Sequence, residues 1–185
     1  MKRPTFLWQA AGFAFATLGG TLLHFLFDWT GGSLLVALFS AVNESTWEHM
    51  KLLYWPLLLF ALIQRRFFKE CKNFWCVKLA GILVGLVLIP VLFYTYNGVL
   101  GKSPDWVNIL IFYVSAAAVF LLEWLLFKKE MGCTRPLLAF IAICLIGGLF
   151  VAFTFALPRI PLFQDPITGI FGIPQKEAAY FRQNI

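Results

Sequence analysis

The residues best suited to chemistry lie in one short polar segment, Asn43 to Lys51, which stands between two apolar stretches. The segment holds two carboxylates, Glu44 and Glu48, and the imidazole of His49 directly after the second of them. Ionisable groups at membrane depth are expensive to bury, and they usually mark a transport pathway, a proton relay or a ligand site. We therefore take this segment as the candidate functional site.

A second polar stripe occurs near the N-terminus. Thr17, Thr21, His24 and Asp28 follow one another at spacings of four, three and four residues, so a helix would carry them on one face. We expect His24 and Asp28 to lie at the end of that helix, level with the polar segment. A histidine one turn before an aspartate, facing two carboxylates and a further histidine, favours a ligand role over simple packing.

A mixture of imidazole and carboxylate groups suits zinc, manganese or iron. The predicted metal ligands are therefore His24, Asp28, Glu44, Glu48 and His49. Glu44 and Glu48 are one helical turn apart and can converge on one point. His49 lies about 100° away from Glu48, so it either approaches that point from the flank or faces another helix. The alternative is a proton relay or an ion-pair cluster in which Lys51 offsets the carboxylates.

A structural interpretation covers part of the same segment. Asn43 or Ser45 is a good N-cap for a helix that begins here, Glu48 has the spacing of a capping box with Ser45, and Trp47 suits an anchor at the membrane interface. Capping alone does not explain why the other charged residues lie so close together.

The composition shows which elements must position these residues. The chain of 185 residues is 61% hydrophobic and 13% charged, which excludes an ordinary soluble domain. A transmembrane helix needs about 20 apolar residues. Four runs are long enough, namely Phe6 to Phe27, Phe74 to Tyr96, Trp106 to Phe127 and Leu137 to Leu157.

A fifth run, Thr46 to Ile63, follows a shorter apolar piece, Leu34 to Val42. As one helix the two would be about 45 Å long, too long for an upright crossing, so we expect a break near Asn43. The predicted fold is an all-α, polytopic transmembrane helix bundle with five spans and a short re-entrant or interfacial helix before span two. Residues 1–157 form its single domain, in which Gly81-x3-Gly85 is expected to bring helices close together.

The distribution of Lys and Arg predicts the orientation, because both collect on the cytoplasmic side. With the N-terminus inside, ten of the fifteen are cytoplasmic: Lys2, Arg3, Arg65, Arg66, Lys69, Lys72, Lys78, Lys128, Lys129 and Arg135. Four fall outside, namely Lys102, Arg159, Lys176 and Arg182, and the fifteenth, Lys51, lies near or within the second span. The C-terminus is then outside, and the net charge of +6 reflects membrane topology and contact with lipid rather than nucleic-acid binding.

Two further expectations concern the cytoplasmic half. No disulfide is expected, because all four cysteines map to cytoplasmic loops or to spans: Cys71, Cys76, Cys133 and Cys144. Glu123, near the cytoplasmic end of the fourth span, is expected to reach toward Lys128 and the lipid head groups. A buried Glu123 would instead favour a polar route across the protein, and hence transport.

The tail, residues 158–185, is rich in turn-forming residues but too apolar for free coil. We expect it to fold back as a lid over the outer mouth of the bundle and to bring Asp165 toward the polar segment. An ordinary surface turn is the alternative.

The run Asn43-Glu44-Ser45-Thr46-Trp47-Glu48-His49-Met50-Lys51, with Asp165-Pro166 and Thr168-Gly169 downstream, resembles a family of small bacterial multi-pass membrane proteins. That family carries an Asn-Glu-Ser-x-Trp-Glu-His-x-Lys signature over most of its length, and its function is unknown. The resemblance implies a bacterial inner-membrane location and singles out the same residues, but it implies no activity.

Three functions remain open. The first is a binding protein or transporter with an outward-facing polar cavity for a cation or small solute. The second is a membrane-embedded, metal-dependent hydrolase acting on a lipid or peptide at the outer leaflet, with Glu44 or Glu48 as the catalytic base; it ranks second because no catalytic motif is present. The third is a structural or accessory subunit. The predicted ligand-binding residues are His24, Asp28, Asn43, Glu44, Glu48, His49, Lys51 and Asp165.

Overall fold

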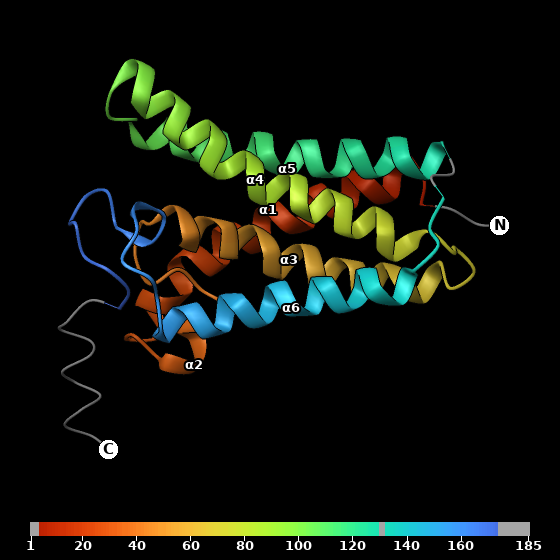
Figure 1. Ribbon diagram of the computed structural model, residues 1–185, viewed down its shortest axis with the longest axis horizontal. Helices are drawn as coiled ribbons and strands as arrows, with labels where there is room; N and C mark the ends of the chain where they lie inside the picture. The colour runs from red at the N-terminus through yellow and green to blue at the C-terminus, as the bar shows by residue number, and fades with distance from the viewer. Residues whose placement is uncertain (1–3, 130–131, 174–185) are drawn as a thin grey trace.

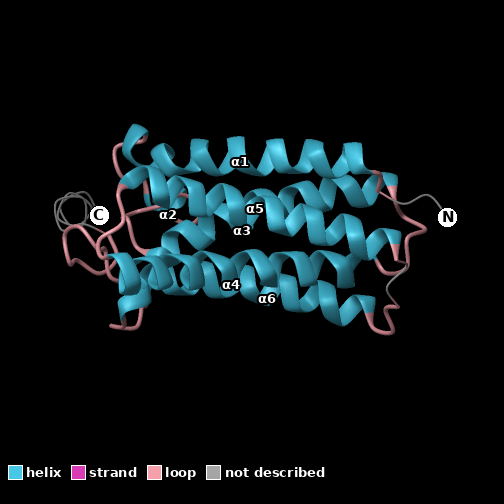
Figure 2. Cartoon of the chain, turned by 90° about the horizontal axis from the view of Figure 1, so that it is seen from above, coloured by secondary structure: helices cyan, strands magenta, loops and turns pink. Residues whose placement is uncertain are grey.

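The computed structural model describes residues 4–129 and 132–173, a part of the chain that contains six α-helices, one 3-10 helix and no strand. The elements are α1 (Phe6–Trp29), α2 (Leu34–Ala37), α3 (Thr46–Phe67), α4 (Phe74–Leu100), α5 (Asp105–Lys128), α6 (Pro136–Phe155) and the 3-10 helix η1 (Pro161–Phe163). The five long helices lie side by side along the long axis of the molecule (Figures 1 and 2). The predicted all-α class is confirmed.

Four of the described helices, α1, α4, α5 and α6, are long and apolar enough to cross a membrane. They coincide with the four long apolar runs of the sequence. Only 28% to 39% of the most apolar window of each helix is buried inside the protein. Most of their surface therefore lies on the outside of the bundle. Such a surface is compatible with a lipid bilayer, because a helix satisfies its own backbone hydrogen bonds.

Helix α3 lies at the centre of the bundle and runs beside the other four (Figure 1). It contacts α1, α4, α5, α6 and η1, and more than half of its 22 residues are buried. It is not among the four apolar spans, because it carries polar and charged side chains along its length. The surrounding helices separate these side chains from lipid, which lowers the cost of placing them in the bundle.

The expected break before α3 is present. The helix that precedes the break is shorter than the apolar piece Leu34 to Val42. Helix α2 covers only Leu34–Ala37, and α3 begins at Thr46 with Ser45 as its N-cap. The hydroxyl of Ser40 ties the segment to α1, because it accepts a hydrogen bond from the Phe27 amide at 3.0 Å and donates one to the Leu23 carbonyl. The segment is thus fixed against the end of α1.

Small residues allow α4 and α5 to pack closely, as the Gly81-x3-Gly85 pattern predicted. A Cβ atom at Gly85 would lie 2.5 Å from Cγ2 of Val119, and one at Gly81 would lie 2.8 Å from the carboxylate of Glu123. Both distances are shorter than van der Waals contact allows. Glycine at these positions therefore lets the side chains of α5 lie against the backbone of α4.

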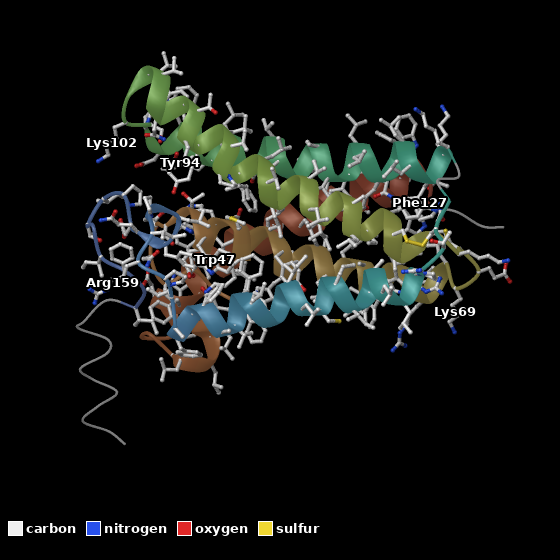
Figure 3. All side chains as sticks on the ribbon, in the orientation of Figure 1. Trp47, Lys69, Tyr94, Lys102, Phe127 and Arg159 are labelled. Atoms are coloured by element: carbon white, nitrogen blue, oxygen red, sulfur yellow. A yellow bond between two sulfur atoms is a disulfide. The ribbon has the colours of Figure 1, made fainter. Side chains whose placement is uncertain are left out.

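Basic residues gather at one end of the bundle, which we call the basic end (Figure 3). In the described residues it carries Arg65, Arg66, Lys69, Lys72, Lys128, Lys129 and Arg135. The opposite end, which we call the site end, carries Lys102 and Arg159. The predicted topology also used four cations that lie outside the described residues, namely Lys2, Arg3, Lys176 and Arg182.

Exposed tryptophans mark the site end, as they do at membrane interfaces. At the site end, Trp29 and Trp106 are 67% and 65% exposed. Trp47 is not one of these anchors. It is buried, with its ring 4.6 Å from that of Phe150 and 4.7 Å from that of Phe163, measured between centroids. The predicted interfacial role of Trp47 is wrong, because the start of α3 lies inside the bundle.

A disulfide joins Cys76 at the start of α4 to Cys133 in the loop before α6. The expectation that no disulfide forms is therefore wrong. The two residues are 57 positions apart in the sequence, but α4 packs against α6 and brings their Cα atoms to 6.0 Å. The expectation rested on the redox state of the compartment, and it took no account of this proximity.

Candidate metal centre

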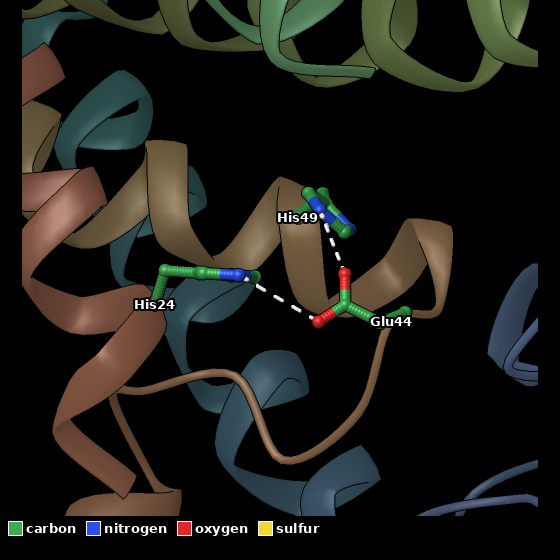
Figure 4. Close-up of side chains that lie close together, drawn as sticks. All are labelled: His24, Glu44 and His49. Atoms are coloured by element: carbon green, nitrogen blue, oxygen red, sulfur yellow. Dashed lines mark ion pairs between the residues drawn. The ribbon is translucent and has the colours of Figure 1, made fainter. Parts of the chain in front are cut away.

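Three of the predicted ligands converge at the site end, each from a different part of the chain (Figure 4). His24 comes from α1, Glu44 from the loop before α3, and His49 from the first turns of α3. Nε2 of His24 lies 3.6 Å from one carboxylate oxygen of Glu44, and Nε2 of His49 lies 3.6 Å from the other. One ligand atom from each of the three residues lies within 4.8 Å of the other two.

The geometry of Glu44 follows from where α3 begins. Ser45 caps the helix and accepts a hydrogen bond from the Glu48 amide at 3.4 Å, while the side-chain oxygen of Asn43 accepts one from the Ser45 amide at 2.8 Å. Glu44 therefore precedes the helix and does not share a helical stripe with Glu48. The predicted convergence of the two carboxylates is wrong, because it required helical backbone at Glu44.

Glu48 points away from the histidines into a buried ion pair. Its carboxylate lies 2.6 Å from Nζ of Lys51 and accepts a hydrogen bond from the Val42 amide at 3.1 Å. Lys51 also donates to the carbonyl of Ala37 at 2.8 Å. The expected capping box does not form, since the Glu48 carboxylate reaches Val42 and not Ser45. This pair holds the α2 segment against α3, which is a structural role.

The remaining residues of the α1 stripe do not join the three ligands. Asp28 is exposed one turn beyond His24, where α1 is about to end. Thr17 is buried and donates its hydroxyl to the Phe13 carbonyl of its own helix at 2.9 Å. Thr21 likewise donates to the Thr17 carbonyl, and it lines the pocket beside His24. Of this stripe, His24 alone supplies a ligand atom to the group of three.

Asp165 connects the tail to the loop that carries Glu44. One carboxylate oxygen accepts hydrogen bonds from the amides of Ile167 and Thr168 at 2.7 and 3.0 Å, and the other accepts one from the Glu44 amide at 3.4 Å. Asn43 donates its side-chain amide to the Gly172 carbonyl at 2.9 Å. Asp165 and Asn43 thus position the Glu44 loop, and neither belongs to the group of three ligands.

The hydrogen bonds to Asp165 stabilise its ionised form. Burial of the side chain tends to raise the pKa of this carboxyl group, but the hydrogen bonds from the amides of Thr168, Ile167 and Glu44 outweigh burial. The pKa of Asp165 is therefore held below its usual range. The carboxylate that fixes the tail is charged at neutral pH.

A cavity of about 420 Å³ opens beside the three ligands, between α1, α3 and α5. A smaller cavity of about 60 Å³ continues on the α4 side, and both are lined by Glu44, His49, Asp105 and Asn108. Neither Asp105 nor Asn108 was among the residues predicted for the site. The signal that could have found them is their position at the outer end of a span, which is the level predicted for the polar segment.

The three ligands fit a divalent transition metal. Zinc binds nitrogen and oxygen ligands at about 2.0 to 2.2 Å, so ligand atoms in a tetrahedral site are about 3.4 Å apart. The Nε2 atom of each histidine lies at a similar distance, 3.6 Å, from a Glu44 carboxylate oxygen, a different oxygen for each histidine. Nδ1 of His49 lies 3.0 Å from the Ser45 carbonyl, which can only accept a hydrogen bond. A neutral His49 therefore carries its proton on Nδ1 and presents the lone pair of Nε2 to the site.

Three protein ligands leave one tetrahedral position open, as in catalytic zinc sites. The Glu44, His24 and His49 side chains are 43%, 28% and 22% exposed and line the cavity, so a solute in the cavity can reach them. The arrangement can hold a cation, and the same cation can bind a water molecule or a donor atom of a second ligand.

Glu123 lies in the other half of the bundle and pairs with Lys78. Its carboxylate is 2.5 Å from Nζ of Lys78, and the two side chains are 1% and 2% exposed. The expectation that Glu123 reaches toward Lys128 is wrong. Gly81 leaves room for the carboxylate between α4 and α5, and Nζ of Lys128 instead lies 5.2 Å from the centre of the Trp124 ring.

Comparison with known proteins adds one finding. Residues 2–173 match the model of a family of unknown function, DUF6512, which covers nearly the whole chain. No curated protein and no solved structure matches the chain.

Proposed function

We propose that this chain, which belongs to the family of unknown function DUF6512, is an integral membrane protein that binds a divalent transition-metal ion through His24, Glu44 and His49. The observation that carries the proposal is the convergence of the three ligand atoms within 4.8 Å beside a cavity. Two imidazoles and one carboxylate suit zinc, manganese or iron. In this proposal the metal ion either is the bound cation itself or anchors a small solute at the site end.

The membrane topology forms part of the proposal. We assign five spans by adding α3 to the four apolar helices, because α3 runs the length of the bundle beside them (Figure 1). Residues 1–157 are then a single transmembrane domain, and α2 is a re-entrant or interfacial helix before span two. The tail from residue 158 onward acts as a lid, which is supported by its hydrogen bonds to Asn43 and Glu44; residues 174–185 lie outside the described part.

We assign the basic end to the cytoplasm and the site end to the outside of a bacterial inner membrane. Seven described cations at the basic end against two at the site end support this orientation. The Cys76–Cys133 disulfide argues the other way, because it lies at the basic end and disulfides are rare in the cytosol. The charge distribution is the stronger indication, because it rests on many residues in several loops.

A metal-dependent hydrolase is the second candidate, favoured by the open coordination position and by Asp105 and Asn108 in the same cavity. There the ion would bind water and lower its pKa, and Glu44 would be a ligand and not a free base. Transport is favoured less, because closely packed rings separate the site from the Lys78–Glu123 pair. A Cβ at Gly20 would lie 2.5 Å from the ring of Phe112, and one at Gly12 would lie 2.4 Å from the ring of Phe120.

The test is the metal content of detergent-purified protein, measured by inductively coupled plasma mass spectrometry after incubation with zinc, manganese or iron salts and desalting. We expect near-stoichiometric metal in the wild type and its loss in Glu44→Gln. Asp28→Asn is the matched control, because it removes a nearby carboxylate that is not among the three ligands, and it should retain the metal. Equal metal content in Glu44→Gln and wild type, or none in either folded protein, contradicts the proposal.

A further inference from the structure

The cavity beside the three ligands has two chemically different walls. His24, Glu44 and His49 form its polar end, with Asn108 and Asp105 nearby. The rest is formed largely by apolar side chains of α1 and α5, namely Phe25, Ile109, Phe112 and Tyr113. A volume of about 420 Å³ is within the range of cavities that bind small organic molecules. A polar end and an apolar wall together fit an amphipathic ligand.

The apolar wall also forms the mouth of the cavity. Phe25, Ile109 and Tyr113 line the cavity and are at the same time 45%, 59% and 38% exposed on the outer surface. They belong to α1 and α5, two apolar candidate spans that contact each other. The cavity therefore opens sideways between α1 and α5, onto a surface suited to acyl chains. Trp29 and Trp106, exposed at the ends of the same two helices, place this mouth at the level of the membrane interface.

The charges around the polar end select the head group. A divalent ion bound by neutral histidines contributes two positive charges, and the carboxylates of Glu44 and Asp105 offset them. Lys102 lines the smaller cavity on the α4 side of Glu44 and His49 and adds one positive charge. The divalent ion and Lys102 favour an anionic head group over a neutral or cationic one. A carboxylate oxygen is also a ligand that zinc, manganese and iron accept.

We propose that this cavity takes a single-chain carboxylate amphiphile from the bilayer. The head group binds the open coordination position of the metal ion. The chain lies against Phe25, Ile109 and Tyr113 and leaves through the gap between α1 and α5. This inference rests on the proposed metal site, and it adds the class of molecule that the site receives.

The test uses the metal as a reporter. Detergent-purified protein is loaded with Co²⁺, whose visible spectrum changes when a ligand enters the open position, and is titrated with sodium acetate, sodium decanoate and decanol. Each methylene that the chain buries strengthens binding, so decanoate should half-saturate the spectral change at a concentration at least about tenfold lower than acetate. Decanol, which lacks the anionic head group, should produce no comparable change.

Two variants separate the cavity from partition into detergent. Ile109→Trp fills the mouth without removing a metal ligand, and it should bring the half-saturating concentration of decanoate close to that of acetate. Leu121→Trp is the control, because Leu121 is 54% exposed on the same helix and does not line the cavity; it should keep the wild-type ratio. Micelles affect both variants equally.

The outcomes are distinct. A Co²⁺ spectrum that responds equally to acetate and decanoate, or the same ratio in Ile109→Trp and Leu121→Trp, overturns the amphiphile inference and leaves the metal site standing. Absence of Co²⁺ binding by the folded wild type overturns both.

Discussion

The imidazole rings of His24 and His49 lie 5.8 Å apart between centroids, with the carboxylate of Glu44 between their Nε2 atoms (Figure 4). Because each histidine supplies one of three ligands, His24→Ala and His49→Ala should each lower the affinity for zinc at least about tenfold. Competition with a chromophoric chelator measures this. Thr17→Ala, on the same stripe of α1 but away from the ligands, should leave the affinity unchanged. A variant lacking one histidine that binds zinc as the wild type does would show that the ion is held elsewhere.

Glu48 and Lys51 should contribute to stability and not to metal binding. Either Glu48→Leu or Lys51→Met leaves one buried charge without its partner, at an expected cost of roughly 3 to 5 kcal/mol. The double variant removes both charges and should recover much of that loss. Thermal unfolding in detergent checks the order of the Tm values, with the exposed Glu70→Gln as control. A double variant less stable than both single variants would contradict the ion-pair interpretation.

Close packing at Gly81 should be essential for the Lys78–Glu123 pair. Gly81→Ala places a Cβ 2.8 Å from the Glu123 carboxylate, so the side chain must move away from Lys78. We expect a loss of roughly 1 to 3 kcal/mol, seen as a lower Tm. Gly148→Ala is the control, because its Cβ would meet nothing within 4 Å, and the change should stabilise α6 by roughly 0.5 to 1 kcal/mol. Equal Tm values for the two variants would show that the α4–α5 contact is looser.

Attachment of the tail should depend on pH through Asp165. Since the pKa of Asp165 is lowered in the folded protein, its contribution to stability is complete above the unfolded pKa of about 3.9 and is lost as the pH falls through the lower folded value. Wild type and Asp165→Asn should therefore differ in Tm at about pH 6, and the difference should shrink at about pH 3. A difference that grows on acidification would contradict the assignment of the charged form.

The two ends of the bundle should face opposite sides of the membrane. Alkaline phosphatase fused within residues 69–73 at the basic end should be inactive, and a fusion within residues 101–104 at the site end should be active, because the enzyme matures only outside the cytoplasm. Both fusions should be compared at equal protein levels. The reverse pattern would overturn the proposed orientation and would accord with the Cys76–Cys133 disulfide.

Much of the fold could be predicted from the sequence, because the relevant properties are local. Hydropathy summed over about 20 residues identified α1, α4, α5 and α6. The break before α3 and the cap at Ser45 follow from residues within a few positions of one another. Helix α3 was harder to classify by hydropathy, because its neighbours shield it and its own surface need not be apolar.

The candidate site was predicted only in part. Its three ligands were all among the five predicted, because ionisable residues in an apolar chain are rare and therefore conspicuous. Which of them converge depended on where α3 begins, because each residue advances a helix by about 100°. The helix begins at Thr46, which left Glu44 beside the histidines. The same start turned Glu48 toward Lys51. The partners of Glu123 and Cys76 come from other helices and loops. The sequence by itself determined the helical membrane class and the candidate residues. Only the tertiary structure decided which of them meet, because long-range contacts depend on how the helices pack and not on any local property of the chain.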